Sequence, residues 1–527
     1  MNGSSPMDPQ IVRLPDGQHF TVTPVFAGLF FKSHELSMQN AFPIGWTIVI
    51  RTEDGVEDGK DGIDKDRGSN TDEGKLSSQP NHQTFKAPTL QNDSLFISSV
   101  SNPSASEFKP AASPTRQIAM ILWVTLYWYF HQPAPAATLT TEASKLTPDA
   151  GKPRGEWRVR IKRDGILRGR NVMPKLERMG LIASWNSWVG TAPGEDDDDS
   201  WSNMFVSQRM FWQIPGRLFL FTLQPVWKGA RSYPGSPASS RPGSPVAIER
   251  AQAKYQPRSD PAETDDLPGT AGPSSLAAVP SFPLGPFFSA SHLPTYYPPA
   301  PLHYTITNHV RHPLRPKPPR MGEVFYTRFV PSVGQYLAFR VASLSHEPVP
   351  YRGPVGPNPP AERGRLLTMS DTALLAAWHA NPRVSRFWGD FSASMLTSAL
   401  QSRHSFPVIG LWDGVPFGYF EIYWVKEDLL GRYAGSSIDD WDRGCHVLIG
   451  EEWARGRVQA WLTSLVHWCF CADYRTMSIC LEPRVDNARF IQHLEYAGFT
   501  KEKEVSFPHK QAWFGRLRRE CWEGPAL

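Results

Sequence analysis

The stretch His446-Val-Leu-Ile-Gly-Glu-Glu-Trp-Ala-Arg-Gly-Arg-Val458, with the apolar run that follows it to Cys471, decides the fold of this chain. An apolar strand enters a short turn, and a long helix leaves it. Such a turn directs several backbone N–H groups at one point, at the positive end of the helix dipole, which suits a pyrophosphate. Arg455 and Arg457 would add positive charge there. The motif alone is weakly specific, because a glycine before a helix is common.

Upstream of this turn the pattern is equally regular. The run 407–412 predicts a strand, Asp413-Gly414 predicts a hairpin turn, and 417–424 predicts the partner strand. Residues 372–380 form an amphipathic pattern that starts at Ser370 and Asp371, as helices prefer. These patterns predict a helix and a hairpin that lead into the strand at His446.

Downstream of the turn the same alternation continues. Residues 477–481 predict a strand, Asn487 begins a helix over 488–496, and Gly498-Phe499 ends it before the final strands. The whole order is helix, hairpin, strand, helix, strand, helix, strand. That order predicts an α+β fold for the C-terminal domain.

The composition predicts folded parts separated by long insertions, because 50 prolines and 40 glycines in 527 residues are too many for a uniformly folded chain. Polar and proline-rich stretches locate the insertions, and strand patterns locate the rest. The predicted organisation is N-terminal strands at 1–51, a disordered insertion at 52–115, the continued N-terminal α+β domain at 116–227, a Pro/Ser-rich disordered insertion at 228–300, strands completing the N-terminal domain at 301–347, a linker at 348–363 and the C-terminal domain at 364–527.

Charge and cysteine usage exclude several classes of protein. A net charge of +4 without a long Lys/Arg block argues against nucleic acid as a partner. Five cysteines, all at or after Cys445, argue against a disulfide framework, and Cys469-x-Cys471 lacks a second pair for a metal site. The apolar run 118–130 is shorter than the ~20 residues of a membrane span. We therefore expect a cytoplasmic protein without membrane contact or metal.

The C-terminal domain carries a resemblance to a known family. The strand, Arg-Gly turn, helix, strand and helix ending at Gly498-Phe499 resemble the acyl-CoA-binding half of the GNAT superfamily of N-acyltransferases. More narrowly, five segments resemble its siderophore-biosynthesis branch: NPRVSRFWG at 381–389, GYFEIYWVKE at 418–427, WDRGCHVLIG at 441–450, EPRVDN at 482–487 and SFPHK at 506–510. Within that branch the chain is most similar to the fungal N5-hydroxyornithine acetylases.

The resemblance implies an enzyme that transfers an acetyl group from acetyl-CoA, a co-substrate rather than a bound cofactor, to the hydroxylamine nitrogen of N5-hydroxyornithine. The implied partners are these small molecules, and a homo-oligomer is possible. Pseudo-symmetric members of such families suggest that the N-terminal half is a degenerate second GNAT unit. The sequence shows no internal repeat that would support this.

Two departures from the family pattern keep other readings open. The phosphate turn reads Arg455-Gly456-Arg457-Val458, two residues shorter than the usual R-G-P-H-R-V. Leu494 stands where many GNAT enzymes have a tyrosine that protonates the leaving thiolate, and we expect its neighbour His493 to point elsewhere on the helix. The alternatives are a non-catalytic GNAT-like scaffold, an enzyme for another acyl group such as anhydromevalonyl, or one for an ordinary amine.

The chemistry predicts a proton acceptor beside the thioester. A hydroxylamine is far less basic than an alkyl amine, so it arrives neutral, and the enzyme need only take the proton shed during attack. We assign His446 to hydroxylamine binding or proton relay and Asp486 to the general base, with Glu482 as the second choice. The resemblance supports the first two assignments. The competing interpretations are a packed core histidine and a helix-start residue.

Two further groups of residues complete the predicted site. Glu421 and Trp424 are candidates for the amino-acid end of the acceptor, with ordinary sheet packing as the alternative, and Asn381, Arg383 and Trp388 are expected to close the same cleft. Backbone N–H groups of the strand after His446 would hold the thioester oxygen. The residues predicted to bind acyl-CoA are Val447, Leu448, Ile449, Arg455, Gly456, Arg457, Val458 and Asn487.

Overall fold

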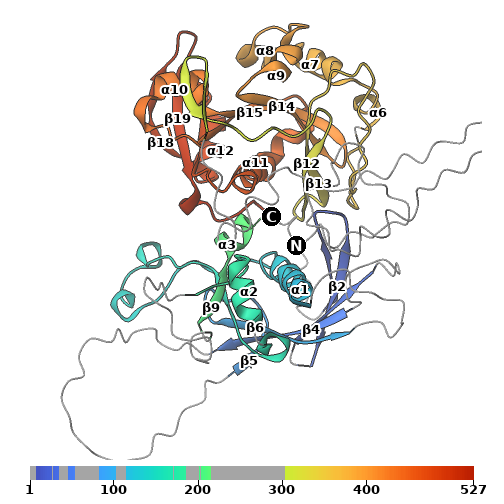
Figure 1. Ribbon diagram of the computed structural model, residues 1–527, viewed down its shortest axis with the longest axis vertical. Helices are drawn as coiled ribbons and strands as arrows, with labels where there is room; N and C mark the ends of the chain where they lie inside the picture. The colour runs from blue at the N-terminus through green and yellow to red at the C-terminus, as the bar shows by residue number, and fades with distance from the viewer. Residues whose placement is uncertain are drawn as a thin grey trace, which may run out of the picture.

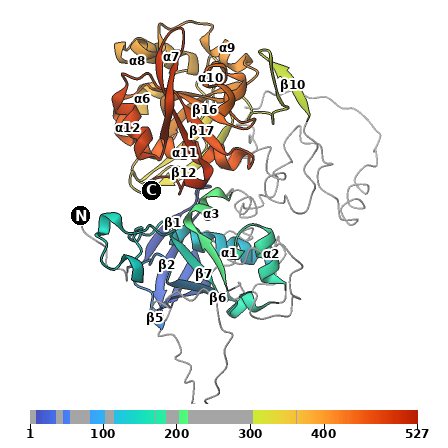
Figure 2. The ribbon, with the colours of Figure 1, turned by 90° about the vertical axis from the view of Figure 1, so that its left-hand side faces the viewer.

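Two α+β halves lie one above the other in the computed structural model, the N-terminal half in blue to green and the C-terminal half in yellow to red (Figures 1 and 2). The structure describes residues 8–26, 28–34, 45–53, 82–101, 114–169, 171–184, 201, 203–214, 303–361 and 363–527. Each half is built on its own mixed sheet, so the α+β class predicted from the sequence is confirmed.

The C-terminal half contains an eight-stranded sheet whose strands follow the order β12-β13-β14-β15-β16-β17-β19-β18. In chain order the strands are β12 (Val324–Val330), β13 (Gln335–Val341), β14 (Ser405–Trp412), β15 (Val415–Trp424), β16 (Arg443–Ile449), β17 (Ser478–Leu481), β18 (Thr500–Ser506) and β19 (Gln511–Arg518). Only β16 and β17 run parallel, and they pair at just Arg443–Ile479 and Gly444–Cys480. The two strands therefore diverge beyond Gly444, as a cleft between splayed strands requires.

Helices cover both faces of this sheet. They are α6 (Arg363–Leu366), α7 (Asp371–His379), α8 (Pro382–Trp388), α9 (Met395–Gln401), α10 (Leu429–Ala434), α11 (Val458–Ala472) and α12 (Ala488–Tyr496). Along β15, Phe420 shares a core with Trp461 of α11, whereas its neighbour Tyr419 shares a core with Leu375 of α7. Alternation along the strand thus gives each face its own helical cover.

The N-terminal half contains a sheet of order β1-β2-β3-β4-β6-β7-β9-β8, with β5 paired to β4. Its elements are β1 (Gln10–Arg13), β2 (His19–Val25), β3 (Gly28–Ser33), β4 (Gly45–Glu53), β5 (His82–Thr84), β6 (Asp93–Ser101), α1 (Pro114–Tyr129), β7 (Arg158–Ile161), α2 (Val172–Arg178), β8 (Ala183–Ser184), β9 (Met204–Ser207) and α3 (Gln208–Gln213). The apolar run 118–130 becomes the buried helix α1. A separate two-stranded sheet joins β10 (Tyr304–Thr307) and β11 (Val310–Pro313).

The two large sheets have the same topology. In each, four antiparallel pairings are followed by one parallel pair, and two antiparallel pairings complete the order. A long helix connects each parallel pair, α1 between β6 and β7 and α11 between β16 and β17. The N-terminal half thus repeats the strand order of the C-terminal half. This repeat is carried by backbone pairing rather than by residue identity, so the sequence does not reveal it.

The halves are joined by a continuous set of contacts. The Tyr326 hydroxyl lies 2.9 Å from Nδ1 of His467 on α11, and the His467 ring lies 5.6 Å from the Trp212 ring of α3. The Thr327 hydroxyl donates to the Pro15 carbonyl at 2.7 Å, and the Tyr336 hydroxyl donates to the Leu14 carbonyl at 3.2 Å. The halves therefore share one interface of aromatic rings and side-chain to backbone hydrogen bonds.

The structure corrects three of the predicted boundaries. Residues 82–101, placed in the disordered insertion 52–115, form β5 and β6, because the apolar run at 95–97 is short and its surroundings are polar. Residues 301–347 do not complete the N-terminal domain, because β13 pairs with β14 in the C-terminal sheet. The linker at 348–363 therefore does not separate two domains. Two parts of the predicted insertion 52–115 fall outside the described residues, namely 54–81 and 102–113. The predicted insertion 228–300 falls outside them entirely.

Candidate active site

Three side chains meet where β16 and β17 diverge. Nδ1 of His446 lies 3.1 Å from a carboxylate oxygen of Glu421, and its Nε2 lies 3.0 Å from a carboxylate oxygen of Glu482. Two phenols complete the cluster: the Tyr419 hydroxyl donates to Glu421 at 2.7 Å, and the Tyr423 hydroxyl donates to Glu482 at 2.7 Å. The histidine predicted from the sequence is therefore held between two carboxylates rather than packed in an apolar core.

Strand register explains why these residues meet. His446 of β16 is paired with Glu421 of β15, so their side chains lie on the same face of the sheet. Tyr419 and Tyr423 share that face because they lie two residues from Glu421 in either direction. Gly444 is required here, since a Cβ at this position would lie 2.2 Å from the Tyr423 ring. Glycine thus lets the Tyr423 hydroxyl reach Glu482.

The electrostatics of the cluster favour a cationic imidazole between two anionic carboxylates. Burial disfavours the charged imidazole, but the hydrogen bonds and charges of Glu421 and Glu482 outweigh it and raise the pKa of His446 to about 10. Burial likewise opposes ionisation of Glu482, yet His446 and Lys510 lower its pKa to about 2. The pKa of Glu421 is also lowered, against its burial, mainly by His446. The cluster carries one net negative charge at neutral pH.

Asp486, the predicted general base, lies outside this cluster. Its carboxylate is exposed and accepts two hydrogen bonds from the Arg484 guanidinium, at 2.6 and 2.7 Å. Arg386 of α8 lies 3.8 Å away. The hydrogen bonds from Arg484 lower the pKa of Asp486. Of the carboxylates in the 482–487 segment, Glu482 is the one in contact with His446, because Asp486 has followed the chain to the surface.

A cleft of about 180 Å³ opens beside His446 and contains most of the predicted acyl-CoA-binding residues. Trp388, whose ring lies 6.4 Å from the His446 ring, forms part of its wall. The predicted residues that line the cleft are Arg383, Trp388, Val447, Leu448, Ile449, Arg455, Val458 and Asn487. Arg383, Arg455 and Arg489 give this apolar cleft a cationic lining, which suits a phosphate-bearing ligand.

The phosphate turn folds as a short 3₁₀ helix, Glu452–Arg457, and α11 starts at Val458. The first turn of α11 has no side-chain cap from its N-cap residue Arg457, and Val458 lines the cleft, so the positive end of the helix dipole borders the cleft. Gly456 and Arg457, which were also predicted to bind acyl-CoA, are not among the residues that line the cleft. Arg457 bonds to Gln335 at 2.5 Å and lies over the rings of Trp412 and Trp453.

Helix α8 lies across the free edge of β16. Asn381 caps the helix by accepting from the Arg383 N–H at 3.0 Å, and its predicted contact with substrate stays a prediction. The Arg383 guanidinium donates to the carbonyls of Ile449 and Gly450 at 2.9 and 2.8 Å. Trp388 Nε1 donates to the Val447 carbonyl at 3.1 Å. Two of the residues predicted to close the cleft therefore bind its strand edge directly.

Trp424 is the predicted substrate residue that the structure removes from the site. It lies three positions from Glu421 on β15 and therefore on the other face of the sheet. Its ring packs against the guanidinium of Arg443, 3.8 Å from the ring centre, and against Trp441. The prediction ignored strand alternation, which separates these two side chains.

Several residues of the site were not predicted. Alternation along β15 would have identified Tyr419 and Tyr423 together with Glu421. Lys510, whose Nζ donates to the Glu482 carbonyl at 2.8 Å, has no local signal beyond the SFPHK resemblance. His493, expected to point elsewhere, lines the cleft from α12 together with Arg489. In the part of the chain that the structure describes, no group of three His, Cys, Asp or Glu residues is placed to hold a metal.

Comparison with known proteins identifies the family. Residues 368–507 match the model of an acetyltransferase (GNAT) domain. An N5-hydroxyornithine acetylase of Beauveria bassiana is 56% identical over 533 residues, which cover 96% of this chain and 100% of that protein. The chain belongs to the GNAT acetyltransferase family. The likeness to this relative extends over both halves of the molecule, whereas the family model matches only part of the C-terminal half.

Other relatives and solved structures are similar to only part of the chain. An N(6)-hydroxylysine O-acetyltransferase of Escherichia coli is 37% identical over 207 residues, 38% of this chain and 57% of that protein. An N(5)-hydroxyornithine:cis-anhydromevalonyl coenzyme A-N(5)-transacylase of B. bassiana is 34% identical over 269 residues, 47% and 51% of the two chains. A solved aminoglycoside acetyltransferase with coenzyme A is 24% identical, covering 29% of this chain and 91% of its own, with a TM-score of 0.26.

Among the helices of this acetyltransferase that the structure describes, none is both long enough and apolar enough to cross a bilayer.

Proposed function

We propose that this GNAT acetyltransferase transfers the acetyl group of acetyl-CoA to the N5-hydroxylamine of N5-hydroxyornithine, a step in hydroxamate siderophore biosynthesis. The observation that carries the proposal is the 56% identity to an N5-hydroxyornithine acetylase along the full length of that protein. The site supports it, because a carboxylate–imidazole cluster lies beside a cationic cleft at the divergence of β16 and β17.

In the proposed reaction the neutral hydroxylamine nitrogen attacks the thioester carbonyl, forming the N–C bond. The nitrogen then loses its proton to a carboxylate, and the C–S bond breaks as the coenzyme A thiolate leaves. A hydroxylamine nitrogen becomes a strong acid once it is attached to the tetrahedral carbon, so a weakly basic carboxylate suffices. Glu482 fits this role, since it is buried in the cluster and ionised.

The remaining cluster residues are assigned by charge. His446 is cationic, so it donates hydrogen bonds and holds Glu482 in place rather than accepting the proton. Glu421, on the other side of the His446 ring, is also negatively charged, and we assign it to binding the α-ammonium group of the amino-acid acceptor. Asp486 stays the alternative base, and its surface ion pair with Arg484 weighs against it.

Acyl-CoA binding is proposed for the cleft beside Trp388. Shortening of the phosphate turn removes backbone donors, but Arg383 of α8 and Arg489 of α12 add cationic groups from outside the turn. This observation weighs against the non-catalytic scaffold. The similarity to the relative whose name specifies anhydromevalonyl coenzyme A covers only 51% of that protein. We therefore favour acetyl-CoA over that donor, and hydroxyornithine over an ordinary amine.

The test is a turnover assay with purified protein, comparing N5-hydroxyornithine with ornithine and acetyl-CoA with longer acyl-CoAs. We expect a mass-spectrometric product of N5-acetyl-N5-hydroxyornithine, with ornithine far slower because its amine is protonated at neutral pH. Equal rates on both acceptors would contradict the siderophore assignment. Absence of thermal stabilisation by millimolar acetyl-CoA would instead favour the scaffold.

The cellular location, the oligomeric state and the excluded partners of this protein stay predictions. The cytoplasmic location rests on cysteine usage. The absence of a nucleic-acid partner rests on charge, and the absence of a membrane partner rests on the shortness of the apolar run 118–130. Homo-oligomer formation has no support from the sequence and stays untested. Cell fractionation and sedimentation of the purified protein would test them.

A further inference from the structure

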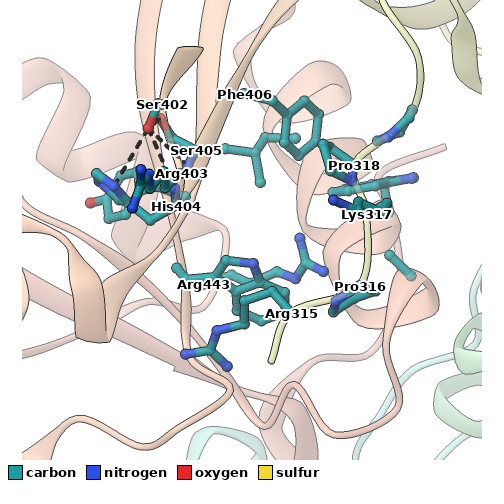
Figure 3. A pocket seen from close by; sticks show the side chains of 16 residues that line it. Arg315, Pro316, Lys317, Pro318, Ser402, Arg403, His404, Ser405, Phe406 and Arg443 are labelled. Carbon is teal, nitrogen blue, oxygen red and sulfur yellow. Dashed lines mark hydrogen bonds between the residues drawn. The ribbon is translucent and has the colours of Figure 1, made fainter. Parts of the chain in front are cut away.

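A second cavity, of about 90 Å³, lies on the face of the sheet opposite the His446 cluster (Figure 3). Arg443 lines it from β16, and since Arg443 is three residues from His446, the two side chains point to opposite faces. The 402–406 segment and the 315–319 segment form its other walls. This cavity shares no lining residue with the proposed acyl-CoA cleft.

The guanidinium of Arg443 is the central feature of this cavity. Arg443 is 5% exposed, and its guanidinium lies 3.8 Å from the centre of the Trp424 ring and 5.1 Å from that of Trp468. Its Nε is buried without a hydrogen-bond partner, and among the described residues no carboxylate forms an ion pair with it. Burial lowers the pKa of Arg443, and the like charge of Arg315 lowers it further.

Other buried arginines of the chain have acceptors. Arg340 donates to both oxygens of Asp371, at 2.7 and 2.9 Å, and Arg516 donates to Asp442 at 2.8 Å. Arg315 pairs with Glu427 at 2.7 and 2.8 Å, yet its Nη1 is buried and unbonded. An unpaired buried charge is strongly unfavourable, so an anion at Arg443 would relieve a specific cost.

The walls of the cavity are suited to an anion. Four of its sixteen described lining residues are cationic, Arg315, Lys317, Arg403 and Arg443, and none of the sixteen is acidic. In Figure 3 the Arg315 and Arg443 side chains lie close together, with Lys317 further along the 315–319 segment and Arg403 on the opposite side of the view. Stacking on an indole ring leaves the N–H edge of a guanidinium free to bind an oxyanion through two parallel hydrogen bonds.

We propose that this cavity binds a small oxyanion, the size of a phosphate or a carboxylate group, between Arg443 and Arg315. The cavity volume admits one such group and excludes a nucleotide. The site is separate from the acyl-CoA cleft, so its ligand is bound in addition to both substrates. Because Arg443 lies on the strand that carries His446, the bound anion stabilises β16 from the face opposite the cluster.

The test is thermal unfolding of the full chain in sodium phosphate, sodium sulfate, sodium acetate or sodium chloride, at matched ionic strength and with saturating coenzyme A. Coenzyme A occupies the other cationic cleft, and matched ionic strength removes general screening. If the site binds a tetrahedral oxyanion, we expect phosphate and sulfate to raise Tm by about 2–4 °C over chloride; if it binds a carboxylate, we expect acetate to do so. The ranking of acetate against phosphate decides between a carboxylate and a tetrahedral oxyanion.

Arg443→Met keeps the side-chain volume and removes the charge. We expect it to unfold at a higher temperature than the wild type in chloride, because the unpaired charge is gone, and to lose the anion-dependent shift. The matched control is Arg340→Met, which leaves Asp371 unpaired. It should lower Tm and keep the anion-dependent shift.

Two outcomes would overturn the proposal: no oxyanion-specific shift in the wild type, or the same shift in Arg443→Met. If Arg443→Met does not fold, the double variant Lys317→Gln and Arg403→Gln takes its place, since both side chains are exposed. A weakened shift in that variant supports the site. An unchanged shift locates the anion elsewhere and refutes it.

Discussion

His446 acts as a fixed cation in this molecule because two carboxylates bind its two ring nitrogens. Its pKa is raised from 6.5 to about 10, so the associated stabilisation is complete below pH 6.5 and is lost as the pH rises through 10. For Glu482, with its pKa lowered to about 2, the stabilisation is present above its ordinary pKa and is lost as the pH falls through 2. The cluster therefore keeps its charges across the physiological range.

Glu482→Gln should lower kcat by about 10²- to 10⁴-fold, because it removes the carboxylate that is proposed to take the proton. The acetyl-CoA affinity should change little, since Glu482 does not line the cleft. One of the two carboxylates that raise the pKa of His446 is lost as well. The alkaline limb of the rate profile should therefore move to lower pH, as measured by steady-state kinetics between pH 6 and about 10.

Asp486→Asn is the matched control, because it removes a carboxylate from the same segment. Since Asp486 is held at the surface by Arg484, we expect less than a tenfold loss of kcat. A large loss in this variant, with activity retained in Glu482→Gln, would restore Asp486 as the base.

Helix α8 connects the acyl-CoA cleft to the edge of β16. Its Arg383 and Trp388 donate to carbonyls of β16 and its following residue, along the part of the strand that β17 leaves free. A free strand edge presents alternating N–H and C=O groups to any extended ligand. We infer that α8 forms a wall whose polar side chains compete with, or add to, the contacts of a bound acyl-CoA.

Arg383→Gln should raise the KM for acetyl-CoA by about tenfold, because a charged donor in the cleft is worth roughly 1.5–3 kcal/mol to a phosphate. The kcat should change little, since Arg383 does not contact the His446 cluster. Arg386→Gln is the control on the same helix, where Arg386 is exposed and lies 3.8 Å from Asp486. Equal effects in both variants would mean that net charge, rather than the position of Arg383, controls affinity.

At the scale of the whole molecule, the interface between the halves depends on a neutral histidine. Burial lowers the pKa of His467 to about 3, and its ring contacts Trp212, Tyr326 and Trp522. The unfolded chain binds a proton at this residue below about pH 6.5, and the folded chain does not. The stability of the folded state therefore falls as the pH drops from 6.5 towards 3.

His467→Gln should remove this acid sensitivity. Between pH 7 and 5 the wild type should lose about 2 kcal/mol of unfolding free energy through His467, at about 1.4 kcal/mol per pH unit, which the variant keeps. Urea unfolding at both pH values measures the difference, with the exposed His346→Gln as the control. Other acid-sensitive groups, including the buried His131, affect all three proteins alike. A pH-independent gap between wild type and His467→Gln would contradict the assignment.

The sequence by itself determined the elements around the site, because strand alternation, the Asp413-Gly414 turn and the glycine after α12 act locally on the backbone. Gly498 has a φ of +94° and Gly414 one of +85°, values that glycine accepts and other residues avoid. The position of His446 beside a cationic cleft followed from the strand–turn–helix pattern. Alternation also contained the positions of Tyr419 and Trp424, although the prediction did not use it.

Only the tertiary structure decided which residues meet across long distances in the chain. Glu482 rather than Asp486 contacts His446, β13 joins the C-terminal sheet, and Arg443 lies in a cationic cavity without an ion pair to any described carboxylate. Each of these depends on strand register and on how far β16 and β17 diverge. Local patterns specify the direction of a side chain along its own strand, whereas the neighbour that it meets is specified by pairing between distant segments.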